Sequence, residues 1–249
     1  MNKDDYGNYT LSEDGLTVIR LPELLPIIVS IRDQFKKYVL DRFTSDDELN
    51  RVFIKRFVDS PEVSNVFSHS SLVSELIKIS KIEKPVFCGP TVSHYTDTGS
   101  TGNGYGLPMH IDFPSMASST KSIICWFALS DCNKATHGLE FIPGLHKEGI
   151  LDGEQTSNGY FLDSKYQNSK KRKILNIKFG DIVFFTSFTP HATHIHEKFQ
   201  GSKMSISKRF DCFLDQEWIN AGLPNAYGTS VDRSLGKERS EAIKHIFNK

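Results

Sequence analysis

The spacing of hydrophobic residues in the first third of the chain predicts amphipathic helices. Between residues 24 and 43, apolar side chains recur at steps of three and four, which places them on one face of a helix. Pro26 fits this assignment, because proline is tolerated in the first turn of a helix. The polar residues at 44–47 are suited to cap a second helix. The predicted elements of this part are a short strand at 16–20 and helices at 24–43, 47–58 and 71–82.

The pattern changes after Lys84-Pro85, where short runs of β-forming residues alternate with turns. Many short strands at this density are typical of a β-sandwich or jelly roll. We therefore predict an α+β, mainly β chain. Its core would be a double-stranded β-helix (a cupin-like jelly roll), with N-terminal helices packed on one sheet and a C-terminal helix at 233–247. The predicted strands are 86–88, 92–95, 122–129, 138–142, 174–177, 181–186 and 203–214.

No internal repeat or low-complexity linker divides the chain, so we expect a single domain over residues 1–249. Its parts would be a helical segment at 1–84, the jelly-roll core at 85–214 and an extension at 215–249. Two polar stretches are expected to be loops beside the mouth of a site and to contact the substrate there. They are the glycine-rich residues 97–108, which lack a phosphate-loop lysine, and residues 151–173, which end in the basic run Lys170-Lys-Arg-Lys173.

Charge and composition narrow the possible partners. The chain has 30 basic and 30 acidic residues, and this balance indicates neither a nucleic-acid partner nor an anionic membrane surface. No apolar run approaches the ~20 residues of a transmembrane helix, and the first residues show no signal-peptide pattern. The four cysteines have neither metal-site nor disulfide spacing. We therefore expect a protein of the reducing cytoplasm.

The first candidate for chemistry is the pair His110 and Asp112. Residues i and i+2 of an extended strand point to the same face, so the two side chains would lie next to each other. An imidazole and a carboxylate held in this way make up two-thirds of the facial triad that binds non-haem Fe(II) and leaves positions open. Taken alone, the pair is also explained by a surface carboxylate near a half-buried histidine. The sequence that follows it decides between these interpretations.

Three later stretches give the pair its context. They are the apolar strand 123–131 with the run Gly138-Leu-Glu-Phe-Ile-Pro-Gly-Leu-His146, then Gly180-Asp181 followed by an apolar strand and Pro190-His191, then the strand 203–210. In this order after His110 and Asp112, they resemble the phytanoyl-CoA dioxygenase family of Fe(II)/2-oxoglutarate oxygenases. The resemblance covers residues 86–214, and its specificity lies in the joint order and spacing of the motifs.

The resemblance implies that Fe(II) is bound by His110, Asp112 and His191. His191 lies where the strand after Gly180-Asp181 ends, which matches the position of the second histidine in the family. His194 and His196 lie close by in the sequence and are alternatives for this ligand. The remaining candidates, His94, His137 and His146, are interpreted as structural.

The resemblance further implies that 2-oxoglutarate is the co-substrate, with its distal carboxylate anchored by a cation on the last strand. Here the chain departs from the family, because Lys203 stands where an arginine is expected. Lysine offers a point charge and lacks the two-pronged donor of arginine. Arg209 lies on the same predicted face of that strand, so either cation can be the anchor. Further co-substrate contacts are expected from the hydroxyls of Thr193, Ser205 and Tyr95 and from the ring of Trp126, which is otherwise a core residue.

The activity implied by the resemblance is oxidation of a small molecule by O2, coupled to conversion of 2-oxoglutarate to succinate and CO2. Family members that halogenate have a small residue in place of the carboxylate, so Asp112 favours hydroxylation of a C–H bond. Desaturation or another oxidation in a biosynthetic pathway is a related alternative. Two alternatives of another kind are a non-catalytic cupin-like binding module and a zinc site built from His191, His194 and His196.

Overall fold

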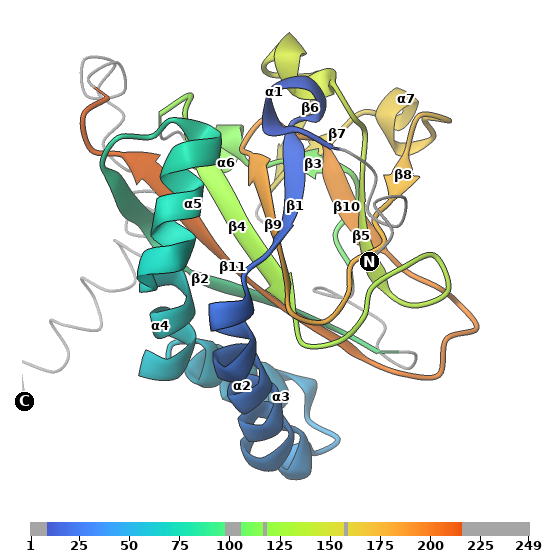
Figure 1. Cartoon of the computed structure of the whole chain (residues 1–249). Helices are drawn as coiled ribbons and strands as arrows, with labels where there is room; N and C mark the ends of the chain where they lie inside the picture. The colour runs from blue at the N-terminus through green and yellow to red at the C-terminus, as the bar shows by residue number, and fades with distance from the viewer. Residues whose placement is uncertain (1–8, 98–105, 117–118, 157–158, 216–249) are drawn as a thin grey trace, which may run out of the picture.

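Two antiparallel sheets face each other in the computed structural model, which describes residues 9–97, 106–116, 119–156 and 159–215 (Figure 1). The first sheet has the order β1 (Leu16–Arg20), β9 (Asp181–Thr186), β4 (Ile123–Ala128), β11 (Lys203–Cys212), β2 (Pro85–Thr96). The second has the order β6 (Gly153–Thr156), β7 (Gly159–Leu162), β3 (His110–Ile111), β10 (His191–His194), β5 (Gly138–Phe141), β8 (Lys173–Ile174). The chain crosses repeatedly between the sheets, and the predicted jelly-roll core is confirmed.

Helices cover the outer face of the first sheet (Figure 1). The main ones are α2 (Leu25–Tyr38), α3 (Asp47–Val58), α4 (Pro61–Ser68) and α5 (Ser70–Ser80). Strand β4 shows how the sheet holds two cores: Ile123, Cys125 and Phe127 pack toward the helices, whereas Ile124 and Trp126 face the second sheet. Because both of its faces are buried, β4 is apolar throughout.

The sequence predicts the positions of most helices but not all of their ends. As expected, α3 begins behind a polar cap, where the Asp46 side chain accepts hydrogen bonds from the amides of Glu48 and Leu49. The helix predicted to reach residue 43 ends at Tyr38, and α4 is an additional short helix that starts at a proline. The remaining short helical elements are α1 (Leu11–Asp14), α6 (Phe113–Met116), α7 (Ser164–Gln167) and the 3-10 turns Pro22–Leu24, Leu40–Arg42 and Leu145–Glu148.

The prediction that residues 151–173 form a polar loop was wrong. This segment contains the paired strands β6 and β7 and then α7, and β7 pairs with β3, where His110 lies opposite Phe161. The basic run at its end is also part of the fold, because Arg172 makes an ion pair with the buried Glu140. The short strand β6 has polar residues, so its sequence does not show a strand pattern. Its stability depends on pairing with neighbouring strands.

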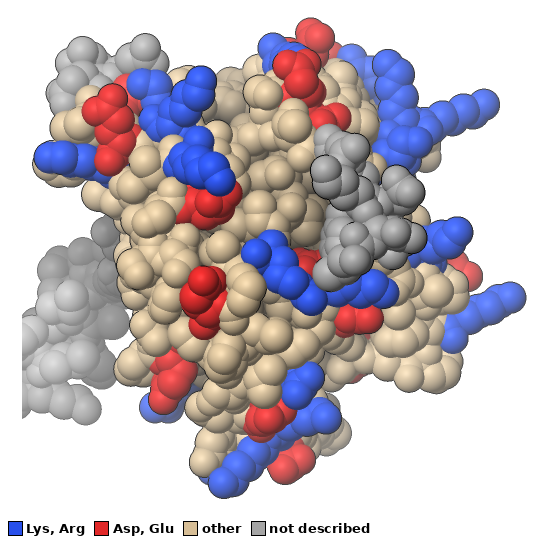
Figure 2. Space-filling view, in the orientation of Figure 1, with Lys and Arg blue, Asp and Glu red and all other residues tan. Residues whose placement is uncertain are grey.

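The predicted strands 86–88 and 92–95 are parts of one strand, β2, which bends at Gly89, where φ is 73°. The expected C-terminal helix at 233–247 and most of the glycine-rich stretch lie outside the described residues. Within the described ranges, no helix is long and apolar enough to cross a membrane. On the face seen in Figure 2, basic and acidic side chains are interspersed, and neither sign dominates a large area.

Candidate active site

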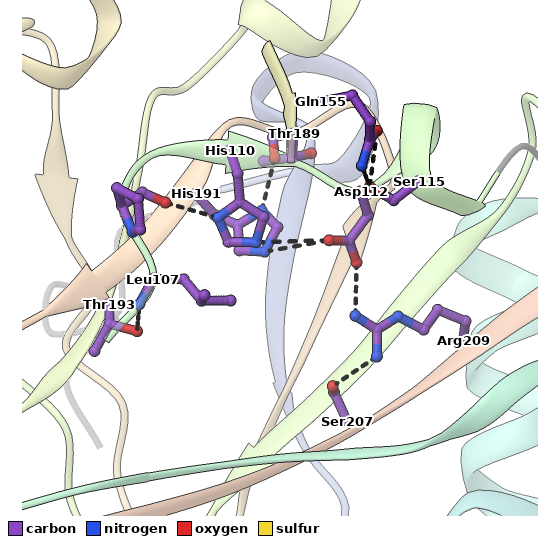
Figure 3. A network of polar contacts seen from close by, with 11 residues as sticks. Leu107, His110, Asp112, Ser115, Gln155, Thr189, His191, Thr193, Ser207 and Arg209 are labelled. Carbon is purple, nitrogen blue, oxygen red and sulfur yellow. Dashed lines mark hydrogen bonds and ion pairs between the residues drawn. The ribbon is translucent and has the colours of Figure 1, made fainter. Parts of the chain in front are cut away.

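The short strands β3 and β10 bring two histidines together. His110 and His191 are direct partners in the antiparallel pairing of these strands, and Asp112 follows at the end of β3 (Figure 3). Oδ1 of Asp112 lies 3.6 Å from Nε2 of His110 and 4.0 Å from Nε2 of His191. The three side chains are buried, and their ligand atoms all lie within 4.8 Å of one another. This spacing fits a single metal ion bound by two imidazoles and one carboxylate.

Backbone carbonyl groups orient both imidazole rings. Nδ1 of His110 lies 2.8 Å from the carbonyl oxygen of Pro108, and Nδ1 of His191 lies 2.9 Å from that of Thr189. A proton on Nδ1 satisfies each carbonyl and leaves the lone pair of Nε2 directed toward Asp112. Hydrogen bonds of this kind fix the tautomer and orientation of histidine ligands in metal sites.

The backbone around Asp112 is fixed by the loop that precedes β10. The amides of Asp112 and Phe113 both donate to the carbonyl oxygen of Ser187 at 3.0 Å. Two residues before His191, the Thr189 hydroxyl donates to the carbonyl oxygen of Gly15 at 2.6 Å. The N-terminal segment and this loop therefore hold all three ligand candidates against one another.

The charge states of the three side chains suit a divalent cation. Burial lowers the pKa of His191 to about 3 and also lowers the pKa of His110, so both rings are neutral near pH 7. Burial would raise the pKa of Asp112, but Arg209 and the two histidines outweigh it and hold that pKa below its usual value. Neutral imidazoles and an ionised carboxylate are the protonation states that metal binding requires.

A pocket lies beside these side chains, between the two sheets. Its floor is the inner face of the first sheet, where alternate residues of β11 line up with aromatic residues of the neighbouring strands. The residues that line the pocket from this sheet are His94, Ile124, Trp126, Phe185, Lys203, Ser205, Ser207 and Arg209. The other wall includes Leu139, His191 and Thr193.

The two candidate anchors, Lys203 and Arg209, both line this pocket but have different partners. Lys203 is 3% exposed, and its Nζ lies 3.4 Å from the carbonyl oxygen of Gly138. Among the described residues, no carboxylate makes an ion pair with it. Burial lowers the pKa of Lys203 to about 8. Arg209, in contrast, donates from Nη2 to Oδ2 of Asp112 at 2.9 Å.

Three of the four other expected co-substrate residues lie at the pocket. Thr193 lines it while its hydroxyl accepts a hydrogen bond from the amide of Leu107, and Ser205 lies on its floor. Trp126 belongs to the pocket and to the inner core at once. The expectation for Tyr95 was wrong: its ring packs against Phe35 and Phe43 on the helical side of the sheet.

The histidine next to Tyr95 replaces it at the pocket. His94 was interpreted as structural, but it lines the pocket opposite Ser205 in the pairing of β2 and β11. Burial and the charge of Lys203 lower its pKa to about 3. Because successive strand residues face opposite sides, only one of His94 and Tyr95 can reach the pocket.

The remaining histidines do not join the cluster. Among the described residues, the one group of histidine, cysteine and acidic side chains arranged to hold a metal is His110, Asp112 and His191. The rings of His194 and His196 are 6.5 Å apart, and His194 Nε2 lies near the carbonyl oxygen of Lys134. His137 receives a hydrogen bond from the amide of His196. Within the described part of the chain, the zinc site of His191, His194 and His196 is not formed.

The Gly180-Asp181 motif has a structural role and does not belong to the pocket. Asp181 is buried and accepts hydrogen bonds from Nε of Arg20 at 2.8 Å and from the amide of Lys178 at 2.7 Å. Gly180 has a φ of 90°, which favours glycine at this turn. The motif therefore joins β9 to β1 and sets the course of the strand that leads to His191.

Comparison with known proteins agrees with this geometry. Residues 12–197 match the family model described as phytanoyl-CoA dioxygenase. No curated protein matches the chain by sequence. The match ends before β11, so Lys203 and Arg209 lie beyond it.

Several solved structures share the fold. EvdO2 from Micromonospora carbonacea var. aurantiaca, complexed with 2-oxoglutarate, is 14% identical with a TM-score of 0.57, covering 84% of this chain and 90% of that one. The non-haem α-ketoglutarate-dependent carbocyclase SnoK from nogalamycin biosynthesis is 13% identical with a TM-score of 0.58, covering 90% and 92%. The epimerase SnoN, in complex with Fe3+, α-ketoglutarate and nogalamycin RO, is 14% identical with a TM-score of 0.52, covering 81% and 80%. At these identities the likeness shows the common fold, and the family match over most of the length places the chain in the phytanoyl-CoA dioxygenase family.

Proposed function

We propose that this protein is an Fe(II)- and 2-oxoglutarate-dependent oxygenase that hydroxylates a C–H bond of a small molecule. The observation that carries the proposal is the buried group of His110, Asp112 and His191 beside a pocket lined by Lys203, a buried lysine that makes no ion pair with any carboxylate of the described residues. When bound, Fe(II) and 2-oxoglutarate supply the oxidising chemistry, in which O2 is consumed and the 2-oxo acid becomes succinate and CO2.

The two histidines and the aspartate would be the metal ligands. Their support is the distance between the ligand atoms and the carbonyl groups that orient both rings. Each residue would contribute one donor atom, and a set of three such ligands would leave further positions of the ion open. The apolar residues Phe185 and Leu139 also line this pocket.

Lys203 would anchor the distal carboxylate of 2-oxoglutarate. A buried ammonium without a carboxylate partner is costly, and an anionic ligand removes that cost. Arg209 is the weaker candidate, because its guanidinium is already engaged with Asp112. Ser205, Thr193 and His94 lie close enough to the pocket to hydrogen-bond the same ligand.

The type of reaction is inferred from Asp112. A carboxylate in the triad occupies the position that halogenating relatives leave free for halide, so hydroxylation is favoured. Relatives of the same fold include an epimerase, a carbocyclase and a mono-oxygenase, which makes another oxidation, such as desaturation, the second candidate. The four cysteines are buried and form no disulfide with one another, which fits the expected reducing cytoplasm.

Uncoupled turnover tests the proposal. Protein loaded anaerobically with Fe(II) and 2-oxoglutarate is exposed to O2, and succinate is measured. We expect succinate from the unaltered protein, none from His191→Ala, and an unchanged yield from His194→Ala, the matched control in the same strand. If no substrate panel elicits succinate and 2-oxoglutarate does not bind, the non-catalytic binding module is the better account.

A further inference from the structure

The two carboxylate oxygens of Asp112 have different surroundings. Oδ1 faces the Nε2 atoms of His110 and His191, whereas Oδ2 accepts a hydrogen bond from Nη2 of Arg209 at 2.9 Å (Figure 3). All four side chains are at least nine-tenths buried. The oxygen on the side of the metal site is therefore Oδ1, and Oδ2 is held on the far side by a charged donor.

The position of Arg209 is itself fixed by the sheet. β11 lies between β4 and β2, and Arg209 pairs with Ile124 on one side and Cys88 on the other. Its Nη1 donates to the Ser207 hydroxyl at 3.4 Å, on the same face of the strand. A guanidinium that is carried by a central strand and contacts Ser207 as well as Asp112 has little freedom to follow a carboxylate that turns away.

We propose that Arg209 is a positioning residue that keeps Asp112 from using both of its oxygens as metal ligands. This inference rests on the proposed function for the metal and the co-substrate. A carboxylate can bind a cation through one oxygen or through both. By engaging Oδ2, Arg209 restricts Asp112 to a single donor, Oδ1.

The number of donors matters for the ligands that follow. With about six positions around the ion, two histidines and one oxygen leave three open, whereas a carboxylate that uses both oxygens leaves two. A 2-oxo acid that chelates the ion through two atoms fills two positions. A site with one-oxygen binding thus keeps a position for O2, and a site with two-oxygen binding does not.

The same contacts assign different roles to Lys203 and Arg209, the two cations of β11 that line the pocket. Lys203 has no carboxylate partner among the described residues and is available to an incoming anion. Arg209 has one, the metal-ligand candidate itself. If Arg209 merely neutralised a buried charge, its loss would lower stability without changing which ligands the metal accepts together.

Nitric oxide, which binds Fe(II) where O2 would, distinguishes these roles because its iron complex has a characteristic electron paramagnetic resonance spectrum. The nitrosyl signal is measured anaerobically at saturating Fe(II), with and without saturating 2-oxoglutarate. The variants are Arg209→Met, which removes the donor at similar size, Arg209→Lys, which keeps the charge, and Lys203→Met as the matched control on the same strand.

The unaltered protein is expected to give the signal in both conditions. Arg209→Met is expected to give it without 2-oxoglutarate and to lose about tenfold or more of it when 2-oxoglutarate saturates the site, with Fe(II) affinity weakened about 10- to 100-fold. Arg209→Lys should restore part of the signal. Lys203→Met should need more 2-oxoglutarate for saturation but keep the signal once saturated.

Equal signals from Arg209→Met and the unaltered protein in both conditions would overturn the proposal. If Arg209→Met does not fold, as judged by thermal unfolding, Arg209→Lys decides alone: a signal reduced only in the presence of 2-oxoglutarate supports the role, and an unchanged one refutes it. Failure of the unaltered protein to bind Fe(II) or 2-oxoglutarate would refute the proposed function, which is a different outcome.

Discussion

Replacing Lys203 by methionine should stabilise the ligand-free protein while removing its affinity for 2-oxoglutarate. Lys203 is 3% exposed and its pKa falls from 10.5 to about 8 because of burial. A fall of this size corresponds to an unfavourable free energy of about 3 kcal/mol for the buried ammonium. Methionine has a similar length and no charge, so Lys203→Met can recover up to this amount in the free energy of unfolding.

The contribution of Lys203 to the free energy of unfolding should change with pH. Below about pH 8 the lysine is protonated in the folded and unfolded states, and the full cost of burial is present. Between about pH 8 and 10.5 the unfolded state binds more protons, so the stability contributed by this group rises with pH. The advantage of Lys203→Met should therefore be largest at pH 7 and should shrink as the pH approaches 10.

Urea unfolding at pH 7 and pH 9.5 measures the stability of both proteins, and anaerobic titration calorimetry with Fe(II) present measures 2-oxoglutarate affinity. We expect Lys203→Met to be more stable at pH 7 and to bind 2-oxoglutarate at least about 100-fold more weakly, the loss of a buried charge-assisted contact worth about 3 kcal/mol. Lower stability of the variant at pH 7 would contradict the cost of burying Lys203, and unchanged 2-oxoglutarate affinity would contradict its role as the anchor.

Four further substitutions test the positions of other residues. Gly15→Ala should destabilise the protein by about 2 kcal/mol or more in urea unfolding, because a Cβ there would lie 2.7 Å from neighbouring side-chain atoms. Gly149→Ala, also at positive φ but with open space, should cost only about 1 kcal/mol, and equal losses would contradict the role of the clash. Tyr95→Phe should leave 2-oxoglutarate affinity unchanged in calorimetry, since the Tyr95 ring faces the helices. Weaker 2-oxoglutarate binding would instead indicate that Tyr95 contacts the co-substrate. Asp181→Ala should lower the free energy of unfolding by about 3 kcal/mol, because Arg20 would lose its buried carboxylate partner. An unchanged free energy of unfolding would show that this contact does not stabilise the fold.

The parts of the site that follow from the sequence are those encoded by short local patterns. His110 and Asp112 share a strand face because they are two residues apart, and Gly180-Asp181 begins the strand that leads to His191. His191 lies next to His110 and Asp112 because β10 pairs with β3. In the sequence, only the combined order of the motifs indicated that these residues come together. The same alternation placed Lys203 and Arg209 on one face, and both line the pocket.

The errors lie where a long-range contact decides the outcome. The inward face of β2 depends on its register with β11, which shifts between Ser207 and Arg209, so sequence alone did not choose His94 over Tyr95. Strands β6 and β7 are short and partly polar, so their own sequence does not predict them. They are stabilised by pairing with each other and by the pairing of β7 with β3. The contact between Arg209 and Asp112 joins residues 97 positions apart and has no local signal.

The dependence of 2-oxoglutarate binding on Fe(II), measured anaerobically by calorimetry, tests the proposed metal site most directly. We predict binding that requires Fe(II), is lost in His191→Ala and is retained in His194→Ala. Binding that is equally strong without Fe(II), or that is lost only in His194→Ala, would contradict the assignment of His110, Asp112 and His191 as the metal site.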